Sequence, residues 1–470
     1  MEDLLKFAIS IAQDAGANWA EARYASEDVT SFYYDNAVPV SSYYTLDNSI
    51  FIRFIINNSV GSVFIPEPTK EKISSMIKKQ VKVAKAASRI NQEKLLFSEE
   101  KAYTKKYSVK EKIKLNSISD EEKSKTILNA YKSLSKLKAF DSSSIGLNTK
   151  ITDKYYMNSN GSLIISKIPE ITMNYFFTVK SNGKTTQRMN YLAGIGGWET
   201  VKNWNLNKSL ISEAKNLTNV LNKGVPAPKG IMDFVVGHEV TGIMVHESVG
   251  HPFEADRIMG RESAQAGESF VKTDMVGRRV GSDYVNIIDT PLIDNSAAYY
   301  LYDEEGVKSR DKLLMKKGLI NEFMHDRSSS AKMGLTSNAS SRISDNSKEP
   351  LIRMSNTYVV PGKATEASLI KDVKKGIYMK NFMEWNIDDT RYNFKAKGNE
   401  SYLIENGELT KPVLFPNLEI DTYKMWSSVD GVGNKASFGM VGGPCGKGEP
   451  MQGVPTSMGG PSLLLRGITL

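Results

Sequence analysis

The chain has 470 residues, a formal net charge of +8, and 40% hydrophobic residues. That length suits about two to three domains with sizeable cores, and the composition is that of a globular rather than a disordered protein. A single cysteine excludes an internal disulfide framework and favours the reducing cytoplasm.

No segment of the sequence predicts export or membrane insertion. The chain starts Met1-Glu2-Asp3 and continues as an amphipathic helix, whereas a signal peptide needs a basic start and an uninterrupted apolar run. No apolar stretch approaches the roughly 20 residues that span a bilayer. We therefore expect a cytoplasmic protein without a membrane partner.

The densest basic run, residues 105–114, raises the question of nucleic-acid binding. Glu111 interrupts this run, and Val109 and Ile113 alternate with its lysines, as in an ordinary element with one solvated face. No nucleic-acid-binding motif accompanies the run. We interpret it as solvated surface and expect no nucleic-acid partner.

The first half of the chain predicts an antiparallel sheet with helices. Its strands are indicated by apolar–polar alternation over 19–65 and 138–195, and its helices by apolar residues at helical spacing. Ser119 followed by Glu122 is typical of a capping box, where a helix begins. Helices are predicted over residues 4–15, 68–88 and 207–222 and after Ser119.

The second half predicts a domain rich in short strands. Residues 223–230 are rich in glycine and proline, so we place a linker there between an N-terminal domain, 1–223, and a C-terminal domain, 231–470. A strand is predicted over 231–236, then a helix carrying the motif described next, and one further helix near 365–375. The whole chain is predicted to be an α+β protein.

The most informative motif is HExxxH, which runs from His246 to His251. The only cysteine, Cys445, lies in a glycine-rich segment far downstream. Two imidazoles and one thiolate are ligands that zinc or iron accepts, and three protein ligands leave a position open, as in catalytic sites. Glu247, beside the first histidine, is then placed to take a proton from water as a general base.

The spacing of the two histidines predicts a distorted helix. Residues five apart lie roughly 140° from each other around an ideal α-helix, so both rings reach one metal only where the helix is under-wound or ends. Gly250 relaxes the backbone at this point, and Pro252 disfavours helical geometry for His251. We therefore predict a π-type bulge or a helix end inside the motif.

Five segments between residues 246 and 455 carry a resemblance to a known family, and the resemblance runs over nearly the whole length of the chain. They are HExxxH with Phe253-Glu254-Ala255-Asp256, then Asp303-Glu304-Glu305-Gly306, Arg353-Met354-Ser355-Asn356-Thr357, Leu403-Ile404-Glu405-Asn406-Gly407-Glu408-Leu409, and Cys445-Gly446-Lys447 with Gln452, Val454 and Pro455. In order and spacing they resemble the motifs of the TldD/PmbA family of metallopeptidases, in its catalytic TldD-type form.

The resemblance implies one divalent transition metal, zinc or iron, bound by His246, His251 and Cys445, with Glu247 as catalytic base. It also implies a peptide substrate and a dimer, either of this chain with itself or with a PmbA/TldE-type subunit. Since PmbA-type members lack the HExxxH motif, this chain resembles the catalytic member.

Two other functions stay open at this stage: a non-catalytic subunit whose metal only stabilises it, and a metal amidase with a non-peptide substrate. Three side chains also have open roles. His238 lies eight residues before His246 and is interpreted as the start of the helix rather than as a ligand. Glu254 is interpreted either as an acceptor that orients His251 or as part of a salt-bridged turn, and the role of Gln452 is undecided.

Overall fold

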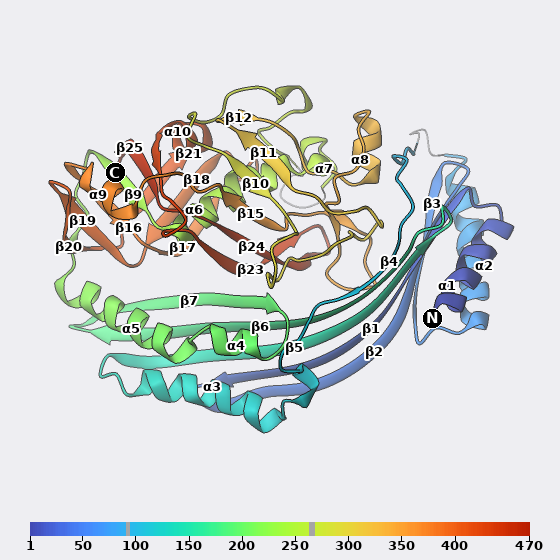
Figure 1. Ribbon diagram of the computed structural model, residues 1–470, viewed down its shortest axis with the longest axis horizontal. Coiled ribbons are helices and arrows are strands. Elements are labelled where there is room, and N and C mark those ends of the chain that lie inside the picture. Colours follow the sequence, from blue (N-terminus) through green and yellow to red (C-terminus); the bar gives the residue numbers. More distant parts are fainter. Residues whose placement is uncertain (91–94, 263–267) are drawn as a thin grey trace.

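The computed structural model describes residues 1–90, 95–262 and 268–470. It is an α+β protein, as the sequence predicted, with a long curved sheet formed by the N-terminal half (Figure 1). The C-terminal half lies on the concave side of this sheet, and the N-terminal helices lie on its outer side.

The predicted helices and strands of the N-terminal half are present. Its elements are α1 Glu2–Asp14, β1 Trp19–Asp35, β2 Val38–Ile56, β3 Ser59–Pro66, α2 Lys70–Ala87, β4 Thr104–Ser108, η1 Leu115–Ser117, α3 Asp120–Ser135, β5 Phe140–Asn158, β6 Leu163–Ser181, β7 Lys184–Ile195, α4 Glu199–Asn203 and α5 Leu206–Lys223.

The N-terminal sheet has seven strands in the order β3-β2-β1-β5-β6-β4, with β7 also paired to β6. Alternate residues of a strand face opposite sides, so one face of β1 carries Ala22, Tyr24 and Phe32 toward the helices. Ala22 and Tyr24 belong to the core under α1 and α2, and Phe32 to the core under α3 and α5. Both helix pairs therefore cover the same face of the sheet.

The opposite face of the sheet meets the C-terminal half through buried polar groups. Arg53 is paired with Glu21 of its own sheet, at 2.7 Å, and with Glu305 of the C-terminal half, at 2.8 Å. The hydroxyl of Tyr156 lies 2.9 Å from a carboxylate oxygen of Glu21 and 2.8 Å from the main-chain oxygen of Glu305, which share its one hydrogen. Arg23 donates to the carbonyl of Lys348. Since each buried charge needs its partner, these contacts fix how the two halves meet.

The C-terminal half contains several small sheets around a large apolar core, with a smaller apolar cluster that includes Leu369 and Ile370 of α9. A seven-stranded sheet has the order β22-β25-β9-β16-β19-β20-β8, a six-stranded one β12-β11-β10-β15-β24-β23, and a three-stranded one β17-β18-β21. The elements are β8 Val225–Pro226, β9 Ile231–Val236, α6 His238–Val245, η2 His246–Gly250, η3 His251–Phe253, α7 Ala255–Ile258, η5 Thr273–Met275, β10 Ile287–Asp289, β11 Lys312–Lys316, β12 Leu319–Ile320, α8 Arg327–Lys332, β13 Ser341–Arg342, β14 Leu351–Ile352, β15 Asn356–Val359, α9 Glu366–Lys371, β16 Lys375–Met379, β17 Phe382–Ile387, β18 Asn393–Gly398, β19 Ser401–Glu405, β20 Glu408–Leu414, β21 Asn417–Asp421, α10 Thr422–Ser427, β22 Val429–Val432, β23 Gly439–Lys447, β24 Gln452–Gly460 and β25 Leu463–Thr469.

The segment predicted as a linker is not wholly irregular. Within 223–230, β8 adds to the edge of the C-terminal sheet by pairing in parallel with β20 at Val413 and Leu414. The sequence does not predict this short strand, because its glycine and proline content is typical of a loop. Because β1 to β7 form one sheet and β8 to β25 form the others, we propose that the domains divide at this segment, at 1–223 and 231–470.

Within residues 1–90, 95–262 and 268–470, no helix combines the length and the apolar character needed to cross a bilayer. The basic run at 105–114 overlaps β4, which pairs in parallel with β6 and leaves Lys105 and Lys106 exposed, in agreement with a solvated face.

Candidate metal centre

The backbone of the HExxxH motif is under-wound, as the spacing predicted. α6 ends at Val245, the π-helix η2 covers His246–Gly250, and the 3-10 helix η3 follows over His251–Phe253. Packing permits this geometry only without a side chain at Gly250, because a Cβ there would lie 1.9 Å from the sulfur of Met354. The result is that the rings of His246 and His251 lie with their centroids 4.9 Å apart.

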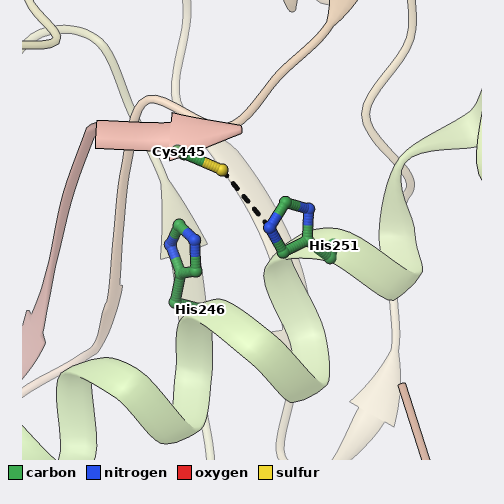
Figure 2. A group of neighbouring side chains, drawn as sticks. All are labelled: His246, His251 and Cys445. Atoms are coloured by element: carbon green, nitrogen blue, oxygen red, sulfur yellow. Dashed lines mark hydrogen bonds between the residues drawn. The ribbon is translucent and has the colours of Figure 1, made fainter. Parts of the chain in front are cut away.

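Cys445 lies on a β-hairpin, which brings its side chain to the two histidines. β23 and β24 pair antiparallel with Cys445 opposite Val454, and β24 pairs in parallel with β15. α6 packs closely on β24, since a Cβ at Gly242 would lie 3.1 Å from the backbone of Gly459. The ligand atoms of His246, His251 and Cys445 all lie within 4.8 Å of one another, and all three residues are buried (Figure 2).

Glu254 orients the second histidine, and a lysine holds Glu254. Its Oε2 lies 3.1 Å from Nδ1 of His251, which leaves Nε2 of that ring facing the sulfur of Cys445 at 3.3 Å. Lys447, two residues beyond the cysteine, pairs with Glu254 at 3.1 Å and with Asp256 at 2.7 Å. Burial alone would raise the pKa of Glu254, but Lys447 and His251 outweigh it and lower that pKa. Glu254 thus fixes the ring orientation of a candidate ligand.

Charges around the cysteine favour its thiolate. Burial alone would raise the pKa of the Cys445 thiol, but the imidazoles of His251 and His246 and the guanidinium of Arg353 bring it well below its usual value. Burial alone would lower the pKa of His251, but Cys445 and Glu254 outweigh it and raise that pKa to about 9. The thiolate is the form of cysteine that binds metals.

The donor set fits a transition metal. One ring nitrogen of each histidine and the sulfur of Cys445 converge in a buried position, so a metal ion held there would have three protein ligands. Two imidazoles and a thiolate match the ligand preferences of zinc and, next, of iron.

Glu247 lies on the same π-helix, and both of its carboxylate oxygens accept hydrogen bonds. The indole Nε1 of Trp385 donates to one oxygen at 3.1 Å, and Nη1 of Arg391 donates to the other at 2.6 Å. These partners lie 138 and 144 residues further along the chain. Neither residue is predicted from the sequence, because no motif surrounds them and only the fold brings them to Glu247.

The structure also settles where two side chains of undecided role lie. His238 begins α6, and its ring packs on Gly439, where a Cβ would lie 2.4 Å from it. It lies outside the group of described residues whose ligand atoms converge. Gln452 begins β24, and its side-chain amide donates to the carbonyl of Glu349 at 3.0 Å. The main-chain carbonyl of Gln452 accepts from Arg353. Both side chains have structural contacts.

Residues 229–470 match the family model described as the PmbA/TldA metallopeptidase C-terminal domain. The protein named Metalloprotease MJ0996, from Methanocaldococcus jannaschii, is 31% identical over 413 residues, which are 88% of this chain and 88% of that protein. The chain belongs to the TldD/PmbA family.

Two further comparisons place the chain among other members. A relative from Saccharolobus solfataricus, named a zinc metalloprotease TldD homolog, is 28% identical over 326 residues, covering 69% of this chain and 70% of its own length. The crystal structure of TldE from Thermococcus kodakarensis matches with a TM-score of 0.75 and 14% identity, over 100% of this chain and 99% of the other. At that identity the likeness to TldE concerns the fold.

Proposed function

We propose that this TldD/PmbA family member is a metal-dependent peptidase that hydrolyses short or unfolded peptides. The observation that carries the proposal is that the ligand atoms of His246, His251 and Cys445 converge. Glu247 lies beside this group, on the π-helix that begins with His246. Relatives named metalloproteases support the reaction class, and one named as a zinc enzyme supports zinc, with iron as the alternative. We assign the three converging residues as metal ligands and Glu247 as the general base.

Each side chain has a distinct part in the proposed reaction. A bound divalent metal would supply Lewis acidity, which polarises a scissile carbonyl and acidifies water. A carboxylate oxygen of Glu247 accepts the proton of the attacking water and returns it to the leaving nitrogen. Glu254 and Lys447 hold the ring of His251 in one orientation throughout. The burial of these groups limits competing water.

An extended peptide can be held at the edge of the sheet beside the metal group. β23, which carries Cys445, is the outermost strand of its six-stranded sheet. An outermost strand offers main-chain donors and acceptors to an added strand, with little dependence on the peptide's side chains. We therefore propose that short or unfolded segments bind there.

The experiment that tests the proposed function uses purified protein with measured metal content and an unstructured peptide, with the products read by mass spectrometry. Peptide cleavage that stops on chelation and returns with zinc is the expected result. Metal-loaded protein that leaves all peptides intact would contradict a peptidase and would favour the non-catalytic subunit. Hydrolysis confined to non-peptide amides would favour the amidase.

The ligand assignment is tested by Cys445→Ser. A hydroxyl is a poorer ligand than a thiolate for zinc, so we expect the bound metal to fall well below one ion per chain in elemental analysis. Unchanged metal content in a folded variant would remove Cys445 from the site. His238→Ala is the matched control, since that ring lies outside the converging group, and we expect it to retain its metal.

We also propose that the protein forms a dimer in the cytoplasm. Over residues 38–47, β2 pairs with β1 on one side only among the described strands, and its side chains are largely exposed. Antiparallel pairing of two copies centred on Ser42 would oppose Val40 to Tyr44 and Val38 to Leu46, all on one face. Such apolar cross-strand pairs are stabilising, so this edge fits a second copy or a TldE-type homologue.

Tyr44→Lys tests this edge. Tyr44 is 60% exposed, and a lysine there would place a charge opposite Val40 at both symmetric positions of the proposed pair of strands, replacing two apolar cross-strand pairs. We expect the variant to shift from dimer to monomer in analytical ultracentrifugation. Val83→Lys is the control, because Val83 is an exposed apolar residue on α2, away from this edge. A Tyr44 variant that remains dimeric would rule out the edge.

A further inference from the structure

We propose that Arg391 and Trp385 form a clamp that positions the carboxylate of Glu247 for proton transfer. This inference rests on the proposed peptidase function and adds two positioning residues to it. Each clamp residue donates one hydrogen bond, to a different oxygen of Glu247, at 2.6 Å from Arg391 and 3.1 Å from Trp385. Two donors on the two oxygens fix the plane of the carboxylate.

The clamp holds Glu247 without using up its ability to accept a proton. Each carboxylate oxygen has two lone-pair directions, and the clamp engages one of them on each oxygen. The side chains of Glu247 and Arg391 are each only 7% exposed, so solvent screens their attraction little. A carboxylate held this way is pre-oriented, which is what efficient proton transfer requires.

Arg391 lies in a turn that hydrogen bonds to Asp388 hold in place. Arg391 has φ of 65°, a left-handed conformation that is uncommon for a residue other than glycine and needs support from its surroundings. Asp388 gives that support, because its carboxylate accepts from Tyr392 N and Asn393 Nδ2, both at 2.7 Å. Thr422 also donates to the carbonyl of Arg391 at 3.2 Å. These contacts hold the turn in the conformation that directs Arg391 to Glu247.

The tryptophan comes from the neighbouring strand of the same small sheet. Trp385 lies on β17, which pairs with β18, and the turn carrying Arg391 joins these two strands. Its ring packs edge-to-face on Phe382 with centroids 5.6 Å apart, and the residue is 37% exposed. One hairpin therefore supplies both donors, and the partly exposed indole lies between the buried carboxylate and the protein surface.

Arg391→Met tests the clamp by removing one donor and its charge. Hydrogen bonds to charged groups and small displacements of a catalytic group typically change rates by about 10–100-fold, so we expect kcat for peptide hydrolysis to fall by about that factor. KM should change by no more than about threefold, because the clamp contacts the base rather than the substrate. The bound metal should stay at the wild-type level. Added guanidinium should restore part of kcat.

Two further variants keep the test decisive if Arg391→Met folds poorly. Arg391→Lys retains the charge without the planar fork, and we expect a smaller loss of kcat. Lys395→Met is the matched control, because Lys395 pairs at the surface with Glu419 on the same small sheet. We expect that control to keep wild-type kcat. A folded Arg391→Met that matches this control would overturn the clamp.

A second readout does not depend on activity. The indole N–H of Trp385 gives one NMR signal among those of the five tryptophans, and Trp385→Phe assigns it. We expect Arg391→Met and Glu247→Gln each to shift this signal while leaving the other four in place. A wild-type protein that cleaves no peptide would contradict the proposed function and leave this readout intact. A Trp385 signal unmoved by both variants would overturn the clamp alone.

Discussion

Glu247→Gln is expected to reduce peptide hydrolysis by about 10²–10⁴-fold while retaining the fold and the metal, because an amide cannot accept the proton that a carboxylate accepts. The substituted side chain keeps its size and an oxygen that can still accept a hydrogen bond. Single-turnover rates on protein with wild-type metal content are the measurement. Turnover near that of the wild type would contradict the role of Glu247 as general base.

This variant needs a stability control, because Glu247 forms a buried ion pair with Arg391. Glutamine removes the carboxylate that pairs with the buried guanidinium of Arg391, and breaking a buried ion pair by removing one partner destabilises a protein by about 3–5 kcal/mol. Stability and circular dichroism must therefore be measured first. Combining Glu247→Gln with Arg391→Met removes both charges, so this double variant should recover stability and still lack hydrolysis. That result would separate a chemical loss from a folding loss.

The structural features that the sequence predicted best are those determined by residues close to one another in the sequence. The alternation over 19–65 and 138–195 predicted long strands, because a period of two places every second side chain on the buried face. The five-residue interval between His246 and His251, together with Gly250 and Pro252, predicted a π-type bulge or a helix end, and the structure contains a π-helix there. In each case the relevant signal lies within a few residues of the structure that it determines.

The features that the sequence could not predict depend on contacts between distant segments. Trp385 and Arg391 lie in an ordinary hairpin, and nothing near them in the sequence indicates that their donors reach Glu247. The pairing of Arg53 with Glu305 joins residues 252 positions apart, and either residue alone resembles any surface charge. Family motifs marked one side of such contacts, as with the turn that holds Glu305, without naming the partner.

Deletion of Val249, which converts HExxxH to HExxH, is expected to abolish metal binding. On a regular helix the shorter spacing is the better one for zinc, so a simple comparison of motifs predicts improvement. Here the π-helix already brings residues five apart together, with ring centroids 4.9 Å from each other. Removing one residue rotates His251 by about 100° relative to His246. Elemental analysis of the folded variant is the measurement.

The deletion has a matched control in Val249→Ala, which keeps the spacing and removes only part of a buried side chain. We expect this control to lose about 1–3 kcal/mol of stability and to retain its metal, because the register of the motif is unchanged. The deletion should also move Glu254 away from Lys447, since that contact depends on the position of η3 relative to the β23–β24 hairpin. A folded deletion variant that binds one metal per chain would mean that the under-wound turn is unnecessary. A loss of metal in both variants would instead point to packing around Val249 as the cause.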